Sequence, residues 1–252
     1  MNVICRILDA LRSLRMQPIP SHQKREFLRE ISVENVQRSF LIVGTVAFLE
    51  LLVALFFTES GHCTKEPVYL VVLFNLVFLP LLWLLYRRRM LISSRTLQIS
   101  VDFYVLGEMA LMCAVAILPQ EKLPTINTYV IALFVAATFI YMSPLERTLL
   151  FGLVYAGFVL ALFHFQSNIE IVIIFSTNAF FMNVLAWILG QLILRMRLKV
   201  FLDRQTIEKN NAALQRLVTQ DSMTALLNHE HAFLRLKEEL SRAKRIGYFP
   251  LS

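Results

Sequence analysis

The sequence predicts an all-α fold: a six-helix transmembrane bundle, then a cytoplasmic helix that forms a coiled coil, then a short helical stub of a further domain. Hydrophobic residues make up 57% of the 252 residues and charged residues only 17%, whereas soluble domains carry about 25% charged residues. The net charge of +7 is spread beside apolar runs, as membrane topology requires. We therefore expect membrane lipid, and not nucleic acid, as the surroundings of this chain.

Residues 1–38 are predicted to form a cytoplasmic amphipathic arm. In Met1–Arg15 the apolar side chains share one helical stripe and the arginines lie elsewhere. This pattern fits a helix in the plane of an acidic lipid surface, and it fits equally an arm packed on its own protein. Pro18 and Pro20 end this helix.

Residues 39–194 are predicted to form the membrane domain. A spanning helix needs about 20 largely apolar residues, and six runs meet or approach that length. The fourth is the shortest. The expected spans are Ser39–Thr58, Pro67–Tyr86, Leu97–Leu118, Asn127–Met142, Thr148–Phe165 and Ile169–Leu194.

Lysine and arginine residues predict the orientation of the spans. Arg87, Arg88, Arg147 and most other basic residues fall in the loops of one side, and only Lys65 and Lys122 fall on the other. Basic residues resist translocation, so the basic side faces the cytoplasm. A multi-pass protein with both termini in the cytoplasm is expected.

Residues 195–220 are predicted to continue the sixth span as a charged coiled-coil helix without glycine or proline. Polar residues at core positions of a coiled coil cost stability but set register and partner number, so we expect a parallel homodimer. A single amphipathic linker helix is the alternative. The apolar core positions are Ile193, Met196, Val200, Ile207, Leu214 and Leu217, and the polar ones are Asp203 and Asn210.

Residues 221–252 begin with a predicted helix start. The Asn228 side chain is suited to cap the free amides of a first turn. Phe233, Leu236 and Leu240 then share one apolar face, and Gly247 is suited to end the helix.

The same segment resembles the start of a GGDEF domain, the catalytic domain of diguanylate cyclases. That family opens with an Asp-x-Leu-Thr-Gly-Leu-x-Asn-Arg stretch, from which Met223, Ala225 and His229 depart. The matching residues of this stretch are Asp221, Thr224, Leu226 and Asn228. In the family a helix and a Pro-Leu-Ser entry to the first strand follow, and the counterparts here are Phe233, Leu240, Arg242, Ala243, Pro250, Leu251 and Ser252.

The resemblance implies a GGDEF-domain stub in a bacterial inner-membrane protein. It implies that the full-length protein makes cyclic di-GMP from GTP with Mg²⁺, through residues that would lie beyond Ser252. No Gly-Gly-Asp-Glu-Phe string occurs in the 252 residues. We therefore expect this chain alone to be non-catalytic and to need no cofactor of its own.

Four polar residues lie at one predicted depth within the spans. Glu50, Asn75, Glu108 and Asn183 each fall roughly 16 Å from the cytoplasmic end of their helix, near the middle of a core about 30 Å thick. Ionisable groups at that depth usually face the bundle interior. They are predicted to form a ligand or proton site, to which Tyr104 adds a hydroxyl, or to hydrogen-bond the helices together.

Metal binding is a weaker expectation. His62 and Cys63 lie in the first external loop and His164 lies near the last one. Histidine and cysteine are ligands for zinc and copper, but their spacing does not match a metal motif.

Three functions remain open at this point. The first is a sensor of an unknown small molecule or ion that controls a diguanylate cyclase. The second is a transporter, or a small-molecule or metal-binding receptor, with a helical tail. The third is a dimerisation module. Against transport, Pro80 and Gly107 are isolated and do not form the broken helix pairs of carrier sites.

Overall fold

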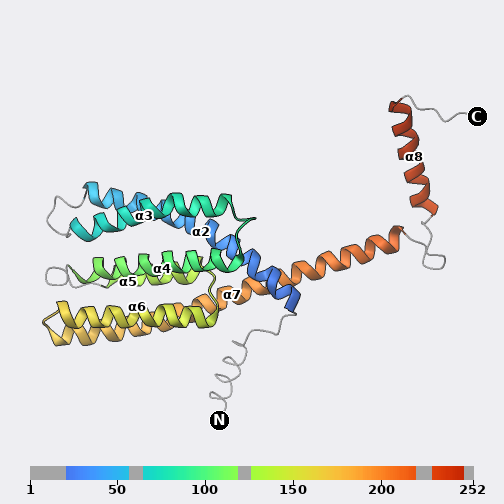
Figure 1. Ribbon diagram of the computed structural model, residues 1–252. Coiled ribbons are helices and arrows are strands. Elements are labelled where there is room, and N and C mark those ends of the chain that lie inside the picture. The colour runs from blue at the N-terminus through green and yellow to red at the C-terminus, as the bar shows by residue number, and fades with distance from the viewer. Residues whose placement is uncertain (1–20, 57–64, 119–125, 220–228, 247–252) are drawn as a thin grey trace, which may run out of the picture. The chain divides into compact units, whose positions relative to one another are not determined.

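The computed structural model describes residues 21–56, 65–118, 126–219 and 229–246 (Figure 1). The described elements are all helices, which confirms the all-α prediction. They are α2 (Ser21–Phe56), α3 (Lys65–Arg87), α4 (Ser94–Ile117), α5 (Asn127–Phe139), α6 (Pro144–Phe165), α7 (Ile169–Thr219) and α8 (His229–Ile246).

Five of these helices are long and apolar enough to cross a membrane, which makes this a multi-pass membrane protein. Their apolar parts are Gln23–Val53, Pro67–Arg87, Ser94–Ile117, Pro144–Phe165 and Ile169–Gln215.

The expected fourth span, Asn127–Met142, is shorter than predicted. Helix α5 has 13 residues and ends at Phe139, so it is about 20 Å long and does not match a hydrocarbon core of about 30 Å. Ile140 adopts an extended conformation, and Ser143 is extended as well. The chain is thus non-helical between α5 and α6.

Two other predicted boundaries also move. Helix α2 begins at Ser21, so residues 21–38 of the expected arm belong to the same helix as the first span. Helix α6 begins at Pro144, four residues before the predicted start at Thr148. Ser143 caps it in a reciprocal capping box with Glu146, and proline suits the first helical turn.

The first of two compact units, Met1–Arg197, is an up-and-down bundle whose helices lie side by side (Figure 1). Helix α4 is central, because it packs against α2, α3, α5 and α6. Gly107 permits the contact with α3: a Cβ atom at this position would lie 2.5 Å from Cζ of Phe74.

Large apolar side chains cover the outside of this unit. Leu41, Leu149 and Leu160 are 61%, 65% and 70% exposed. A soluble protein rarely exposes so much contiguous apolar surface, whereas lipid acyl chains favour it. The exposure pattern therefore agrees with the membrane assignment.

The second unit, Leu198–Ser252, contains the charged end of α7 and the whole of α8. Helix α7 has 51 residues and no break, which confirms that the sixth span continues as a helix through the predicted coiled-coil segment. Helix α8 begins directly after Asn228 and ends directly before Gly247, as predicted. Asn228 and Gly247 themselves lie outside the described residues.

Candidate functional site

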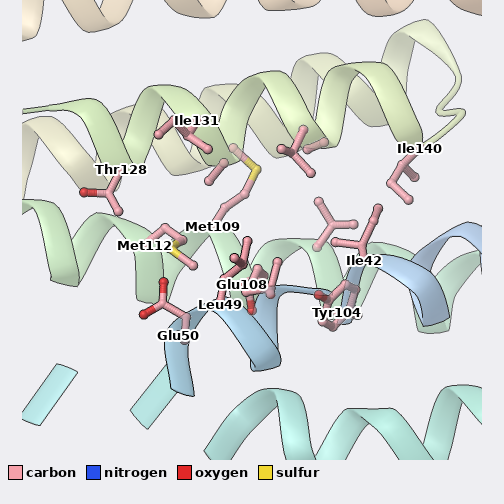
Figure 2. Close-up of a pocket in the computed structure, with 15 residues that line it drawn as sticks. Ile42, Leu49, Glu50, Tyr104, Glu108, Met109, Met112, Thr128, Ile131 and Ile140 are labelled. Atoms are coloured by element: carbon pink, nitrogen blue, oxygen red, sulfur yellow. The ribbon is translucent and has the colours of Figure 1, made fainter. Parts of the chain in front are cut away.

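A cavity of about 200 Å³ lies between α2, α4 and α5. Figure 2 shows Glu50 of α2, Glu108 of α4 and Thr128 of α5 around it. The rest of its wall is mainly aliphatic or methionine side chains, among them Met109 and Met112. The cavity is therefore apolar with two carboxyl groups. Glu50 and Glu108 are two of the four polar residues that were predicted to lie at one depth in the membrane.

Asn75 connects this cavity to α3. Its Nδ2 donates to Oε2 of Glu108 at 3.0 Å and to the carbonyl of Val71 at 3.0 Å. Its Oδ1 accepts from the Tyr104 hydroxyl at 3.2 Å. Asn75 is fully buried, so this amide joins α3 to α4 and also orients the Glu108 carboxyl.

One oxygen of Glu108 has no partner. Oε2 accepts from Asn75, but Oε1 is buried and makes no hydrogen bond. The whole residue is only 8% exposed. A buried acceptor without a donor costs about 1–3 kcal/mol, so this oxygen is a place where a bound molecule would gain affinity.

Asn183 does not join the other three residues. Its Nδ2 donates to the hydroxyl of Tyr129 at 3.2 Å and to the carbonyl of Phe151 at 3.1 Å. It lines a separate, shallower hollow between α6 and α7. The predicted set thus divides into one cluster of three residues and one residue that ties α7 to α5 and α6.

Of the expected metal ligands, only His164 lies in the described part of the chain. His164 is exposed and its ring lies 4.9 Å from that of Phe165. His62 and Cys63 lie outside the described residues. Among the residues that are described, no group of three His, Cys, Asp or Glu side chains could hold a metal ion.

The sequence reasoning missed a second polar cluster, around the non-helical segment after α5. Asn35 of α2 is fully buried and bonds both backbone groups of Tyr141. Its Oδ1 accepts from the Tyr141 amide at 2.9 Å, and its Nδ2 donates to the Tyr141 carbonyl at 2.7 Å. Gln98 of α4 also accepts from Asn35, at 2.9 Å. These bonds replace the helical ones that the segment lacks, as buried backbone requires.

Arg147 supports the same segment from α6. It is fully buried, and it donates to the Met142 carbonyl at 3.1 Å and to Oε1 of Gln191 at 3.2 Å. Gly190 of α7 makes room for it, because a Cβ atom there would lie 2.8 Å from the guanidinium carbon. A buried arginine of this kind holds backbone in place between helices.

An ion cluster adds to this end of the bundle. Arg197 binds Glu30 and, at 2.9 Å, Glu34. Glu34 also pairs with Arg38 at 2.7 Å. Arg29 donates to two backbone carbonyls of the turn between α3 and α4. The basic residues that predicted the cytoplasmic side therefore meet at one end of the bundle.

One signal in the sequence points to this second cluster. Ser143-Pro144 followed by Glu146 is a capping-box pattern, and it indicates a helix that starts before Arg147. That start leaves the residues before Ser143 outside any helix, so their backbone needs polar partners. The identity of those partners, Asn35 and Gln98, had no signal in the local sequence.

No known protein family, curated protein or solved structure matches the chain. The opening motif of the resemblance to GGDEF domains, Asp221 to Asn228, lies outside the described residues. The arrangement in the bundle offers an apolar cavity with acidic acceptors. It is suited to binding a small, largely apolar molecule with a polar group.

Proposed function

We propose that this chain is the membrane sensor and signalling region of a bacterial diguanylate cyclase. The observation that carries the proposal is α7, a helix of 51 residues that holds both apolar membrane residues and a charged heptad pattern. A continuous helix of this kind is suited to transmit a rotation or shift of its membrane part to a domain that follows it in the chain. The resemblance of residues 221–252 to a GGDEF start supplies the identity of that domain.

The heptad stripe supports dimerisation. Met196, Val200, Ile207 and Leu214 are 69%, 56%, 58% and 58% exposed. They recur at the spacing of coiled-coil core positions, so a second copy of the helix would bury them. In the GGDEF family two catalytic domains must meet, each with one GTP, so the register of a coil would control the reaction.

The cavity beside Glu50 and Glu108 is the proposed input. A ligand that binds one helix arrangement better than another favours that arrangement by the difference in affinity. The Asn75–Glu108 hydrogen bond links α3 with α4. A ligand that binds the Glu108 carboxyl would therefore either displace Asn75 from it or strengthen this hydrogen bond. The resulting shift in helix packing is the proposed signal.

The first test is the coding sequence after Ser252. The proposal expects the reading frame to continue into a Gly-Gly-Asp-Glu-Phe motif or a close variant. A stop codon, or a different domain, would reject the diguanylate cyclase assignment.

The second test is made in that full-length protein. Glu50→Gln and Glu108→Gln keep the shape of the side chain and remove its charge. Both are expected to change cyclic di-GMP levels at equal protein amount and equal dimer content. The matched control is Glu170→Gln, at an exposed carboxyl in the first turn of α7. Unchanged output in both cavity variants would mean that the carboxyls only hold the helices together.

Transport is the second candidate function, and one observation favours it. The non-helical residues after α5 lie between two cavities. Ile140 lines the one with Glu108, and Tyr141 lines another of about 530 Å³ that Asp102 and Glu146 also line. Broken helices at cavities are a feature of carriers. Uptake of a labelled amine into vesicles that contain the protein, abolished by Glu108→Gln, would favour transport over signalling.

A further inference from the structure

We propose that the cavity between α2, α4 and α5 binds a small hydrophobic amine, whose ammonium group is held by Glu108 and Glu50 and whose apolar body fills the chamber. This inference deepens the proposed function, on which it rests for the role of the cavity as the sensor input. The binding itself is argued from the geometry alone.

The size of the cavity sets the size of the ligand. A dry apolar cavity of about 150 Å³ in another protein accepts benzene. This one measures about 200 Å³, so it has room for one aromatic ring and a short side chain. Drug-sized ligands usually occupy roughly 300 Å³ or more, so a smaller molecule fits this cavity better.

The walls of the cavity require that the ligand be largely apolar. Most of the lining is aliphatic, from residues such as Ile42, Val105 and Val135. Met109 and Met112 add thioethers, which make favourable contacts with aromatic rings. Figure 2 shows both methionines beside Glu108.

The polar groups of the cavity require a donor on the ligand. Glu108 Oε1 is buried, has no partner and belongs to a residue that is 92% buried, since 8% of it is exposed. Glu50 supplies a second carboxyl, and no lysine or arginine lines the cavity. An ammonium group offers N–H donors and a positive charge, so it satisfies both needs.

A metal ion is a poorer occupant. Hard cations take six or more oxygen ligands, and this cavity offers two carboxyls and the hydroxyls of Tyr104 and Thr128 within apolar walls. A lone metal ion would also leave most of the cavity volume empty. An organic amine places its ammonium group at the carboxyls and its apolar body against the aliphatic walls.

The route of entry fits the same class of ligand. Leu49 of α2 and Ile131 of α5 line the cavity and are 53% and 62% exposed. They lie on the surface that faces lipid in a membrane-spanning bundle. A hydrophobic amine partitions into the bilayer and would reach Glu108 from there.

The test compares 2-phenylethylamine with n-propylbenzene, which has a methyl group in place of the amine. The full chain is placed in lipid nanodiscs with its methionine methyl groups labelled with ¹³C. The amine is expected to shift the signals of Met109 and Met112, which line the cavity, and not that of Met182, which does not. It should bind about tenfold or more tightly than n-propylbenzene, because a hydrogen bond to a charged group is lost in the hydrocarbon.

Two variants complete the test. Glu108→Gln should weaken the amine about tenfold or more and leave n-propylbenzene unchanged, while Glu170→Gln should change neither. If Glu108→Gln does not fold, Glu50→Gln and the comparison of the two ligands on the wild-type chain still decide the question. Equal affinity for both ligands, or Met109 and Met112 signals that respond to pH but not to millimolar amine, would overturn the proposal.

The outcomes of the binding test and of the signalling test can be told apart. Amine binding with no effect on cyclic di-GMP would retain the site and reject the sensor role. An effect of Glu108→Gln on cyclic di-GMP without amine binding would retain the sensor role and reject the amine.

Discussion

Gly190 is expected to be essential for the packing of α7 against Arg147, and Gly190→Ala is the smallest change that tests it. A Cβ atom at this position would lie 2.8 Å from both Cζ and Nε of Arg147 and 3.0 Å from the Ala137 carbonyl oxygen. Arg147 is fully buried and bonded to Met142 and Gln191. These two bonds fix the guanidinium, so a shift away from a new Cβ atom is expected to lengthen or break one of them.

The magnitude follows from three opposing contributions. Alanine is favoured over glycine inside a helix by about 1 kcal/mol. Overpacking costs about 1–3 kcal/mol, and loss of one hydrogen bond to a charged group costs about 1.5–3 kcal/mol. The sum predicts that Gly190→Ala lowers the free energy of unfolding by about 1.5–5 kcal/mol.

The matched control is Gly157→Ala in α6, where a new Cβ atom would meet nothing within 4 Å. This variant should be more stable than the wild type by up to about 1 kcal/mol. Unfolding is measured in mixed micelles of sodium dodecyl sulfate and a mild detergent. Tryptophan fluorescence reports the transition in a Trp83→Phe background, in which the signal comes from Trp187, about one helical turn before Gly190.

A double-mutant cycle identifies the cause. Arg147→Met removes the guanidinium, so Gly190→Ala should cost at least about 1 kcal/mol less in that background. Wild-type or higher stability of the single variant Gly190→Ala would refute the packing argument. Equal costs in both backgrounds would show that Arg147 is not the side chain that resists the change.

Three further predictions concern the helix interface, the topology and the non-helical segment. Cysteine at Leu214 should crosslink between copies in membranes and cysteine at Ala212, on the opposite helix face, should not; equal crosslinking would reject the coiled coil. In intact cells an impermeant thiol reagent should label Cys63 and spare Cys5, and labelling of Cys5 would reverse the topology. Asn35→Leu should lower the free energy of unfolding by about 2–4 kcal/mol, because the Tyr141 amide loses its acceptor and the Tyr141 carbonyl keeps only the 3.4 Å bond from Gln98.

The control for the last of these is Gln37→Leu, two residues further along α2 at an exposed position. Surface substitutions of this kind change stability by about 0.5 kcal/mol or less. A cost for Asn35→Leu no larger than that of Gln37→Leu would mean that the segment after α5 does not depend on this amide.

The secondary structure could be predicted largely from the sequence. Long apolar runs bounded by charges can bury their backbone groups in a bilayer only as helices, so α3, α4, α6 and α7 were recognisable without any tertiary information. The unbroken course of α7 followed from the absence of glycine and proline between Arg195 and Gln220. The helix α8 followed from its amphipathic face and its predicted ends.

The candidate site could be predicted in part. Depth along each helix correctly grouped Asn75 with Glu108, because the rise per residue is nearly constant. It placed Asn183 at the same depth but could not say which neighbour that side chain faces. Rotation about the helix axis is set by packing, and it directed Asn183 to Tyr129 and Phe151 instead.

The sequence by itself determined that this protein is a helical membrane protein with polar groups inside its spans, because hydrophobicity and helical periodicity are local properties. The tertiary structure alone decided that Glu50 and Glu108 border one cavity and that Glu108 has an oxygen without a partner. It also decided that Asn35 and Arg147 hydrogen-bond the backbone of the non-helical segment after α5. These features join residues that lie far apart in the chain. Their contacts depend on how the helices rotate and approach each other, and that is a property of the packed bundle.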